Sequence, residues 1–265
     1  MTLVLPAVMG VVNVTPDSFS DGGHHSDTDG AVAHGVQLAA QGASVLDIGG
    51  ESTRPGADPV PEAVELARVV PVIRGLRAAL GDTVRLSIDT QKAVVARAAC
   101  AAGATLINDV SATLAQTAAD CGAGYVVMHR QGDAKTMQIA PEYDDVVAEV
   151  VEFLRAHAVA AAALGVREVW VDPGLGFGKT AAHNWRLIAH LDEIVALGYP
   201  VVVGASRKSF LGLALAASDG VASVAAEDRR EASLSVATWA MLHGARMVRA
   251  HDVRMTVQAA RVVAA

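Results

Sequence analysis

The chain has 265 residues with a formal net charge of −7, and 52% of its residues are hydrophobic while 18% are charged. This length and composition predict one large globular domain, and a negative charge without a basic stripe argues against nucleic acid as a partner. The N-terminus lacks a basic leader, and no run approaches the roughly 18 apolar residues of a membrane helix, so we expect a cytoplasmic protein with no membrane contact.

Eight short apolar runs recur along the chain, and each ends in polar or charged residues. Ala-rich stretches with helical periodicity lie between them. Strand and helix alternating eight times predict an α/β fold, a single (β/α)8 TIM barrel over residues 1–265, whose active site lies at the C-terminal rim of the strands. The predicted strands are Ala7–Val14, Ser44–Gly50, Val84–Thr90, Thr105–Val110, Tyr125–His129, Val169–Gly174, Val201–Ser206 and Met247–Asp252.

A predicted helix follows each strand, and a glycine ends most of these helices. The seventh unit is longer than the others, because a surface loop at 218–225 separates two helices. Cys100 and Cys121 lie in helical stretches and are interpreted as small buried thiols. The predicted helices are Asp29–Gln41, Pro61–Leu80, Gln91–Ala102, Leu114–Asp120, Tyr143–Ala163, Ala181–Ala196, Arg207–Ala217, Ala226–His243 and Val253–Val263.

Two connections are too long and too polar for ordinary turns between a strand and a helix. They are Thr15–Thr28 after the first strand and Glu51–Pro59 after the second, and both are rich in Gly, Ser, Asp and Pro. Loops of this composition at the rim of a barrel are typically mobile and functional. The sequence therefore predicts long mobile loops after strands 1 and 2.

Polar side chains at the ends of three strands predict a site for a planar heterocycle. Asp89 ends the third strand, Asn108 lies in the fourth and Asp172 ends the sixth. A carboxylate after an apolar strand is costly to bury unless it meets hydrogen-bond donors or a cation. Two carboxylates and an amide suit an aminopyrimidine edge, which offers adjacent N–H donors. Each residue alone is equally well explained as a helix cap, but three on one rim favour a ligand.

A second group of rim residues predicts an anion site. Arg54, Arg249 and His251 come from units two and eight, which adjoin when the barrel closes, and such cations suit a phosphate or diphosphate. Asn13 at the end of the first strand offers an oxygen suited to Mg²⁺ or to a water network linked to a phosphate. Lys208 follows the seventh strand, where it is interpreted as a donor to a ligand carbonyl or as a solvated charge.

The segment PGLGFGKT at Pro173–Thr180 is close to a nucleotide-binding loop, but Pro173 occupies the position of the required first glycine. The segment also follows the sixth strand of a barrel, so we do not interpret it as a nucleotide site. Its glycines are instead expected to let the backbone approach a flat ligand, with Phe177 covering one face.

The motifs together resemble the dihydropteroate synthase family, in the order in which that family carries them. The segments that carry the resemblance are MGVVNVTPDSFSDGG at 9–23, DIGGESTRPGA at 47–57, SIDT at 87–90, NDVSA at 108–112, DPGLGFGKT at 172–180, GASRKSFLG at 204–212 and RAHDV at 249–253. One departure is Ala250, where the family usually has a bulkier aliphatic residue.

The resemblance implies a transferase of folate biosynthesis. It would condense 6-hydroxymethyl-7,8-dihydropterin diphosphate with p-aminobenzoate, releasing 7,8-dihydropteroate and pyrophosphate, with Mg²⁺ as cofactor. It also implies a homodimer, and competitive inhibition by sulfonamides, which mimic p-aminobenzoate.

The resemblance also assigns the rim residues to three ligands. The pterin would contact Asp89, Asn108, Met128, Asp172, Phe177 and Lys208. The diphosphate would contact Asn13, Arg54, Arg249 and His251, with Mg²⁺ near Asn13. The p-aminobenzoate would contact Phe19, Thr53, Arg54, Pro55, Phe177, Ser206 and Lys208. The catalytic set would be Asp89, Lys208, Arg249 and His251.

We expect a dissociative mechanism, in which pyrophosphate leaves first and the amine of p-aminobenzoate then attacks a pterin methylene cation stabilised by Asp89. Two alternatives share the pterin pocket. A pterin-dependent methyltransferase is disfavoured by the STRPG and SRKSFLG segments and by the Arg and His cluster, since its reaction has no diphosphate to bind. A non-catalytic pterin-binding paralogue is disfavoured because the chemical residues are intact, and it would bind pterin without releasing pyrophosphate.

Overall fold

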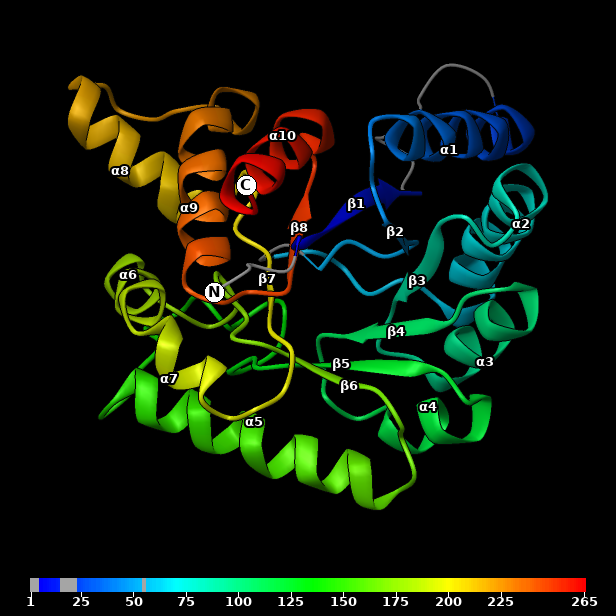
Figure 1. Ribbon diagram of the computed structural model, residues 1–265, viewed down its shortest axis with the longest axis horizontal. Coiled ribbons are helices and arrows are strands. Elements are labelled where there is room, and N and C mark those ends of the chain that lie inside the picture. The colour runs from blue at the N-terminus through cyan, green and yellow to red at the C-terminus, as the bar shows by residue number, and fades with distance from the viewer. Residues whose placement is uncertain (1–4, 15–22, 54–55) are drawn as a thin grey trace.

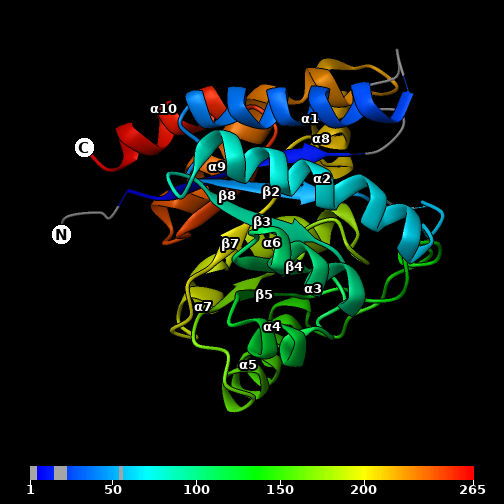
Figure 2. The ribbon, with the colours of Figure 1, turned by 90° about the vertical axis from the view of Figure 1, so that its right-hand side faces the viewer.

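In the computed structural model, which describes residues 5–14, 23–53 and 56–265, eight parallel strands form a barrel and helices surround it (Figures 1 and 2). The strands pair in the order β6-β5-β4-β3-β2-β1-β8-β7, and a bridge between Val171 and Val201 joins β6 to the segment that leads into β7. The strands are β1 (Ala7–Asn13), β2 (Val45–Gly49), β3 (Arg85–Asp89), β4 (Leu106–Asp109), β5 (Gly124–Met128), β6 (Val169–Asp172), β7 (Val202–Val203) and β8 (Met247–Ala250). The predicted TIM barrel is confirmed.

The helices lie outside the strands, and consecutive helices such as α1 and α2 pack side by side along the chain (Figure 2). None of the helices in the described residues combines the length and apolar character that crossing a membrane needs. The helices are α1 (Gly23–Ala40), α2 (Glu62–Leu80), α3 (Ala93–Ala102), α4 (Ala115–Cys121), α5 (Val146–Ala163), α6 (Ala181–Ala189), α7 (Leu191–Val195), α8 (Ser209–Asp219), the short 3-10 helix η2 (Ala226–Asp228), α9 (Arg230–Leu242) and α10 (Val253–Val263).

Two apolar clusters form the core because successive strand residues point to opposite sides. The larger cluster fills the space between strands and helices with residues such as Leu46, Ile48 and Ile88. The smaller cluster fills the barrel interior and consists of Met9, Val45, Leu106, Val126, Val202 and Met247. Two residues further along β2, β4 and β8 the same inward direction places Asp47, Asn108 and Arg249. The interior therefore carries an apolar floor with a polar layer above it, at the C-terminal ends of the strands.

Several predicted boundaries differ from the structure, and three of them concern α1, the helix before β7 and α8. Helix α1 begins at Gly23, six residues before the predicted start, so part of the predicted loop Thr15–Thr28 is helical. Weak local propensity is overridden there because the helix packs along α2. The predicted helix Ala181–Ala196 is two helices, because His190 has φ −111° and ψ 34°, which are not helical angles. Helix α8 extends into the predicted loop at 218–225 and ends at Asp219.

Candidate active site

Asp47 is the centre of the polar layer inside the barrel. Its carboxylate is fully buried and accepts hydrogen bonds from Ser87 Oγ at 2.6 Å, Asn108 Nδ2 at 2.9 Å and Arg249 Nε at 2.7 Å. These donors come from three different strands, so the carboxylate links β2 to β3, β4 and β8. The sequence placed Asp47 near the end of a strand, but sequence reasoning gave it no role. A charged residue inside the apolar run VLDIG was the signal, since such burial requires partners.

Asp89 is the second carboxylate that Arg249 contacts, with 2.9 Å between Oδ2 and Nη2. Burial raises the pKa of Asp89 to about 7; the Arg249 guanidinium opposes this rise and the nearby Asp47 carboxylate adds to it. Burial acts to lower the pKa of Arg249, but the two carboxylates more than compensate and raise it. One guanidinium thus contacts two buried carboxyl groups, and Arg249 lies against the predicted pterin residue Asp89 as well as belonging to the predicted anion site.

Asn108 and Asp172 complete the predicted heterocycle site. Asn108 is buried, and its Nδ2 is directed to Asp47. Asp172 accepts a hydrogen bond from the Gly174 N–H at 2.7 Å. Burial raises the pKa of Asp172, while the charge of Lys208 opposes the rise. Met128, also buried, pairs in register with Asp172 on the neighbouring strand. The structure therefore brings these three residues together with Asp89 in one layer of the barrel.

Lys208 faces the same layer from the start of α8. Its Nζ donates to the carbonyl oxygen of Leu175 and lies 4.4 Å from the centre of the Phe177 ring. Burial lowers the pKa of Lys208 to about 8, and the Asp172 carboxylate opposes that change. Lys208 thus lies between the loop after β6 and the carboxyl groups of Asp172 and Asp89, with its Nζ over the face of the Phe177 ring.

Ser206 and His251 form a pair at the ends of β7 and β8. Ser206 Oγ lies 3.0 Å from His251 Nδ1 and accepts the His251 backbone N–H at 3.2 Å. The resemblance assigned Ser206 to p-aminobenzoate and His251 to the diphosphate. Their contact shows that these two predicted subsites are neighbours.

The loop PGLGFGKT is closed on itself by Lys179. This side chain is 2% exposed, and its Nζ lies 3.0 Å from the carbonyl oxygens of both Gly174 and Phe177 and 2.8 Å from His129 Nδ1. Burial and the charge of Lys179 lower the pKa of His129 to about 3, so the imidazole is neutral. The lysine organises the loop and does not reach outward to a phosphate, in agreement with the rejection of a nucleotide site.

Two glycines of this loop also have a packing role that the sequence did not predict. Gly174 has φ 64°, and a Cβ there would lie 1.8 Å from the carbonyl oxygen of His129. A Cβ on Gly178 would lie 2.2 Å from the carbonyl oxygen of Gln131. Both glycines are therefore required for close packing of this loop against the segment that follows β5, and the approach of the loop to a flat ligand stays a prediction.

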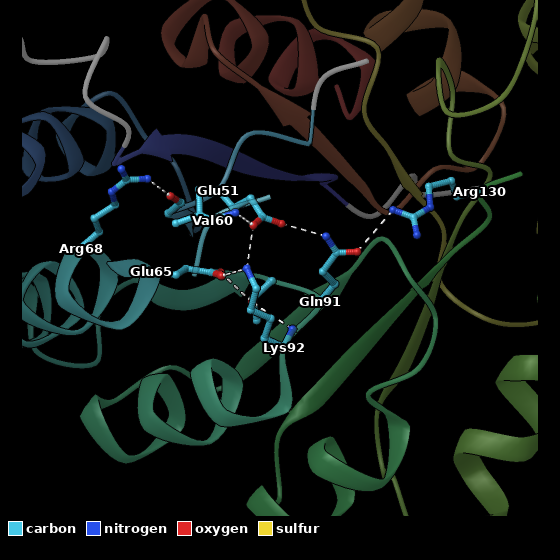
Figure 3. Close-up of polar contacts among 9 residues, drawn as sticks. Glu51, Val60, Glu65, Arg68, Gln91, Lys92 and Arg130 are labelled. Carbon is cyan, nitrogen blue, oxygen red and sulfur yellow. Dashed lines mark hydrogen bonds and ion pairs between the residues drawn. The ribbon is translucent and has the colours of Figure 1, made fainter. Parts of the chain in front are cut away.

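An ion-pair network anchors the loop after β2 (Figure 3). Lys92 Nζ lies 2.6 Å from Glu51 Oε2 and 2.5 Å from Glu65 Oε2. Glu51 also accepts hydrogen bonds from the Val60 N–H at 2.6 Å and from Gln91 Nε2 at 2.8 Å. Burial acts to raise the pKa of Glu51, but the hydrogen bonds from Lys92, Val60 and Gln91 lower it. Sequence reasoning missed this network, because its members are separated by up to 41 positions.

The same loop lines a cavity of about 370 Å³ together with the segment that follows β5. Thr53, Gln91 and Arg130 are among its walls. Arg130 Nη1 lies 3.4 Å from Gln91 Oε1, which joins the cavity to the network in Figure 3. Thr53, predicted to contact p-aminobenzoate, therefore lies at an opening beside the barrel rim.

Three predicted site residues, Phe19, Arg54 and Pro55, lie outside the described residues. Asn13 ends β1 and is half-buried, in register with Gly49 of β2. No group of three or more His, Cys, Asp or Glu side chains suited to a metal occurs in the part of the chain that the structure describes. A single amide oxygen matches the way Mg²⁺ is commonly bound, through few protein ligands together with substrate phosphate oxygens and water.

Comparisons with known proteins agree on one family. The chain matches the pterin binding enzymes over residues 9–251. It is 50% identical to the dihydropteroate synthase of Mycobacterium leprae over an alignment that covers 100% of this chain and 95% of that protein. Two solved structures have a TM-score of 0.89. The Xanthomonas albilineans dihydropteroate synthase with 4-aminobenzoic acid is 48% identical and covers 99% of this chain and 93% of its own. The Yersinia pestis dihydropteroate synthase with a sulfonamide drug is 43% identical, with 99% and 94% covered.

The barrel, its polar rim and these matches define a pterin binding enzyme, and the chain belongs to that family. Within it, the chain groups with the dihydropteroate synthases, which are transferases of folate biosynthesis. Its reaction condenses 6-hydroxymethyl-7,8-dihydropterin diphosphate with p-aminobenzoate and yields 7,8-dihydropteroate and pyrophosphate.

Proposed function

We propose that this synthase works by a dissociative mechanism in which Asp89 stabilises a pterin methylene cation after pyrophosphate has left. The observation that carries the proposal is the contact of one guanidinium with two buried carboxylates, at 2.7 and 2.9 Å. Arg249 attracts the leaving diphosphate, and the carboxylate beside it faces the cation that the departure creates. Charges fixed in a buried site stabilise a developing charge without having to reorganise.

The pterin occupies the polar layer above the apolar floor. Asp172 accepts hydrogen bonds from the aminopyrimidine edge, and Asn108 supplies a donor or acceptor beside it. Lys208 donates to the ring carbonyl, while Met128 and Phe177 contact the ring faces. The raised pKa of Asp172 and the lowered pKa of Lys208 show that both groups are poorly solvated, which is the environment in which hydrogen bonds to a ligand are strong.

The diphosphate lies at the ends of β1 and β8, against Asn13, Arg249 and His251, and Arg54, which is outside the described residues, belongs to the same predicted set. Mg²⁺, held by Asn13 together with diphosphate oxygens and water, would add positive charge to the leaving group when bound. On departure, the charge that develops on the pyrophosphate is shared by the guanidinium and imidazole groups of this chain.

The p-aminobenzoate enters from the side of the loops after β2, β6 and β7. Thr53, Phe177, Ser206 and Lys208 surround its ring and carboxylate, with Phe19, Arg54 and Pro55 completing the set. Its neutral amine attacks the methylene carbon, so no covalent protein intermediate is required. Closure of the surrounding loops excludes water, which would otherwise capture the cation.

Positional isotope exchange tests the order of steps. The oxygen that bridges the pterin methylene and the diphosphate is labelled with ¹⁸O, and the enzyme is incubated with this substrate and Mg²⁺ but without p-aminobenzoate. Reversible departure of pyrophosphate scrambles the label into non-bridging positions. Retention of the label by an enzyme that turns over when p-aminobenzoate is added contradicts the dissociative order. Pyrophosphate release that depends on both substrates excludes a non-catalytic paralogue.

Sulfonamides are proposed to compete with p-aminobenzoate at this site, and the Yersinia pestis relative is known in a sulfonamide complex. Because both ligands carry an arylamine and an acidic group, we expect a sulfonamide to raise the apparent KM for p-aminobenzoate in proportion to its concentration and to leave kcat unchanged. Steady-state kinetics at varied p-aminobenzoate check this. Inhibition that leaves the KM for p-aminobenzoate unchanged would contradict a site shared by p-aminobenzoate and sulfonamides.

We also propose a homodimer in the cytoplasm. Helices α8 and α9 expose three large apolar side chains, Leu213, Trp239 and Leu242, and such a cluster favours an interface between copies. Cys100 and Cys121 are free thiols, which is typical of a reducing compartment. Fractionation of cells that produce the chain, with activity assayed in each fraction, tests the location.

A further inference from the structure

Arg207 has an unusual backbone conformation between two residues of the site. Its φ is 60°, in the left-handed region, and among the described residues only two other non-glycine residues, Ala112 and Ala140, have a positive φ. Side chains other than glycine adopt this region at a cost, and they keep it where the surroundings leave no alternative. Ser206 and Lys208 flank it on either side.

Three separate contacts hold Arg207 in place. Its N–H donates to Ser233 Oγ at 2.9 Å, and its carbonyl oxygen accepts from Arg229 Nη1 at 3.0 Å. Its guanidinium forms a bidentate ion pair with the Asp252 carboxylate, with Nε 3.1 Å from Oδ2 and Nη2 2.9 Å from Oδ1. The side chains of both partners are largely shielded from solvent, with 25% and 18% exposed. These contacts bind Arg207 to the end of the eighth unit.

The contacts of the two neighbours depend on this backbone direction. On one side Ser206 Oγ meets His251, and on the other Lys208 Nζ reaches Leu175 and lies over Phe177. If φ of residue 207 changed to a negative value, the backbone between Ser206 and Lys208 would rotate. The two side chains would then not both keep their present contacts. Asp252, which directly follows His251, therefore controls the geometry of residues that precede α8.

We propose that the Arg207–Asp252 ion pair is a positioning device that orients Ser206 and Lys208 toward p-aminobenzoate. Arg207 and Asp252 are positioning residues and do not themselves touch substrate. The proposal rests on the roles proposed above for Ser206 and Lys208. It predicts that loss of the ion pair affects binding of p-aminobenzoate more than binding of the dihydropterin diphosphate.

The first test is Asp252→Asn, assayed by steady-state kinetics with each substrate varied in turn. We expect KM for p-aminobenzoate to rise roughly 10-fold, while KM for the dihydropterin diphosphate changes by less than about twofold. Asp252→Glu restores the ion pair and should recover most of the affinity. Arg230→Met is the matched control, because Arg230 contacts Asp252 at 3.5 Å without touching Arg207. It should leave both KM values near those of the unmodified enzyme.

The second test separates backbone strain from loss of charge. Arg207→Gly and Arg207→Ala both remove the guanidinium, but only glycine adopts a positive φ without strain. We expect the Ala variant to have a KM for p-aminobenzoate at least about threefold higher than the Gly variant. Thermal unfolding of each protein checks that the variants are folded at the assay temperature.

The outcomes are distinct. An unchanged KM for p-aminobenzoate in Asp252→Asn overturns the proposal. A larger rise in KM for the dihydropterin diphosphate than for p-aminobenzoate also overturns it. A fall in kcat alone that matches the loss of folded protein overturns it as well. If the unmodified enzyme itself fails to couple the two substrates, the proposed function is overturned, and the positioning proposal that rests on it is overturned as well.

Discussion

Asp89 lies between two charges of opposite sign, the guanidinium of Arg249 and the carboxylate of Asp47. Burial is the largest influence on its pKa, which is raised to about 7. At neutral pH the group is therefore close to its midpoint of ionisation, and small changes in its surroundings alter its charge. The proposed mechanism requires the carboxylate form, since a neutral acid does not stabilise a cation.

This gives a pH prediction. As pH falls below about 7, Asp89 becomes protonated, so kcat/KM for the dihydropterin diphosphate should fall by about tenfold per pH unit. Asp89→Asn should lower kcat/KM by roughly 10²-fold or more and remove this acidic limb. A pH–rate profile of both proteins measures the two effects.

The control for this assignment is Asp47→Asn. The negative charge of Asp47 helps to raise the pKa of Asp89, so its removal should move the acidic limb to lower pH, whatever happens to the maximal rate. A limb that stays in place in Asp47→Asn, or that persists in Asp89→Asn, assigns the titration to another group.

Residue types at the rim could be predicted from the sequence, because the alternation of strand residues and the position of strand ends are local properties. The position of Asp89, Asn108 and Asp172 together at the C-terminal ends of the strands follows from that pattern. The hydrogen-bond and ion-pair partners of these side chains could not be predicted. The contact of Arg249 with Asp47 joins residues 202 positions apart, and the geometry of a closed barrel decides which inward side chains meet.

At the scale of elements, the base of the loop after β2 depends on a single cation. Lys92 is shared by Glu51 and Glu65, and the exposed fraction of the Glu65 side chain is only 1%. Without the lysine, two carboxylates would remain close together in a poorly solvated site. Removal of one partner from such a pair is strongly destabilising, because the charge left behind is uncompensated.

Lys92→Met should therefore lower the free energy of unfolding by about 3 kcal/mol, measured by urea denaturation. Lys135→Met is the matched control, because Lys135 pairs with Asp58 at the surface, where both side chains are mostly exposed, and the change in the free energy of unfolding should be much smaller. Equal effects of the two substitutions would show that the network in Figure 3 contributes no more than a surface ion pair.

The loop after β6 allows a second stability prediction. Ala at position 174 would place Cβ 1.8 Å from the His129 carbonyl oxygen in addition to straining a φ of 64°, so we expect a loss of at least about 3 kcal/mol. Gly198→Ala has a φ of 82° with open space around the new Cβ and should cost about 1 kcal/mol. Chemical denaturation of both variants gives their free energies of unfolding, and the difference separates the cost of the steric clash at position 174 from the cost of backbone strain alone. Similar losses would mean that the segment after β5 moves away at little cost.

The sequence predicted the number and order of elements more reliably than their ends. No residue type at these positions signals the helix break at His190 or the early start of α1. Helix caps were easier to predict. Gly103, for example, ends α3 in the left-handed conformation that glycine favours.

At the scale of the whole molecule, the helix ring leaves large apolar side chains exposed on several helices, and three of them lie on α8 and α9. Leu213 of α8 and Leu242 of α9 are 62% and 56% exposed, and Trp239 of α9 is 44% exposed. Helices α8 and α9 pack against each other, on the opposite side of the barrel from the end of α5 (Figure 1). A stable dimer buries about 800 Å² per partner, and a face that spans two helices is suited to provide it.

The proposed dimer should therefore dissociate when charge is placed on this face. We expect sedimentation velocity of the unmodified enzyme to give twice the chain mass, and Leu213→Glu with Leu242→Glu to give the monomer mass with unchanged circular dichroism. Leu164→Glu, at the exposed end of α5, should remain dimeric. Like charges facing each other across a two-fold interface oppose association, while a single charge elsewhere on the surface does not. A monomeric unmodified enzyme at micromolar concentration, or a double variant that stays dimeric, would show that the exposed face of α8 and α9 is not the interface.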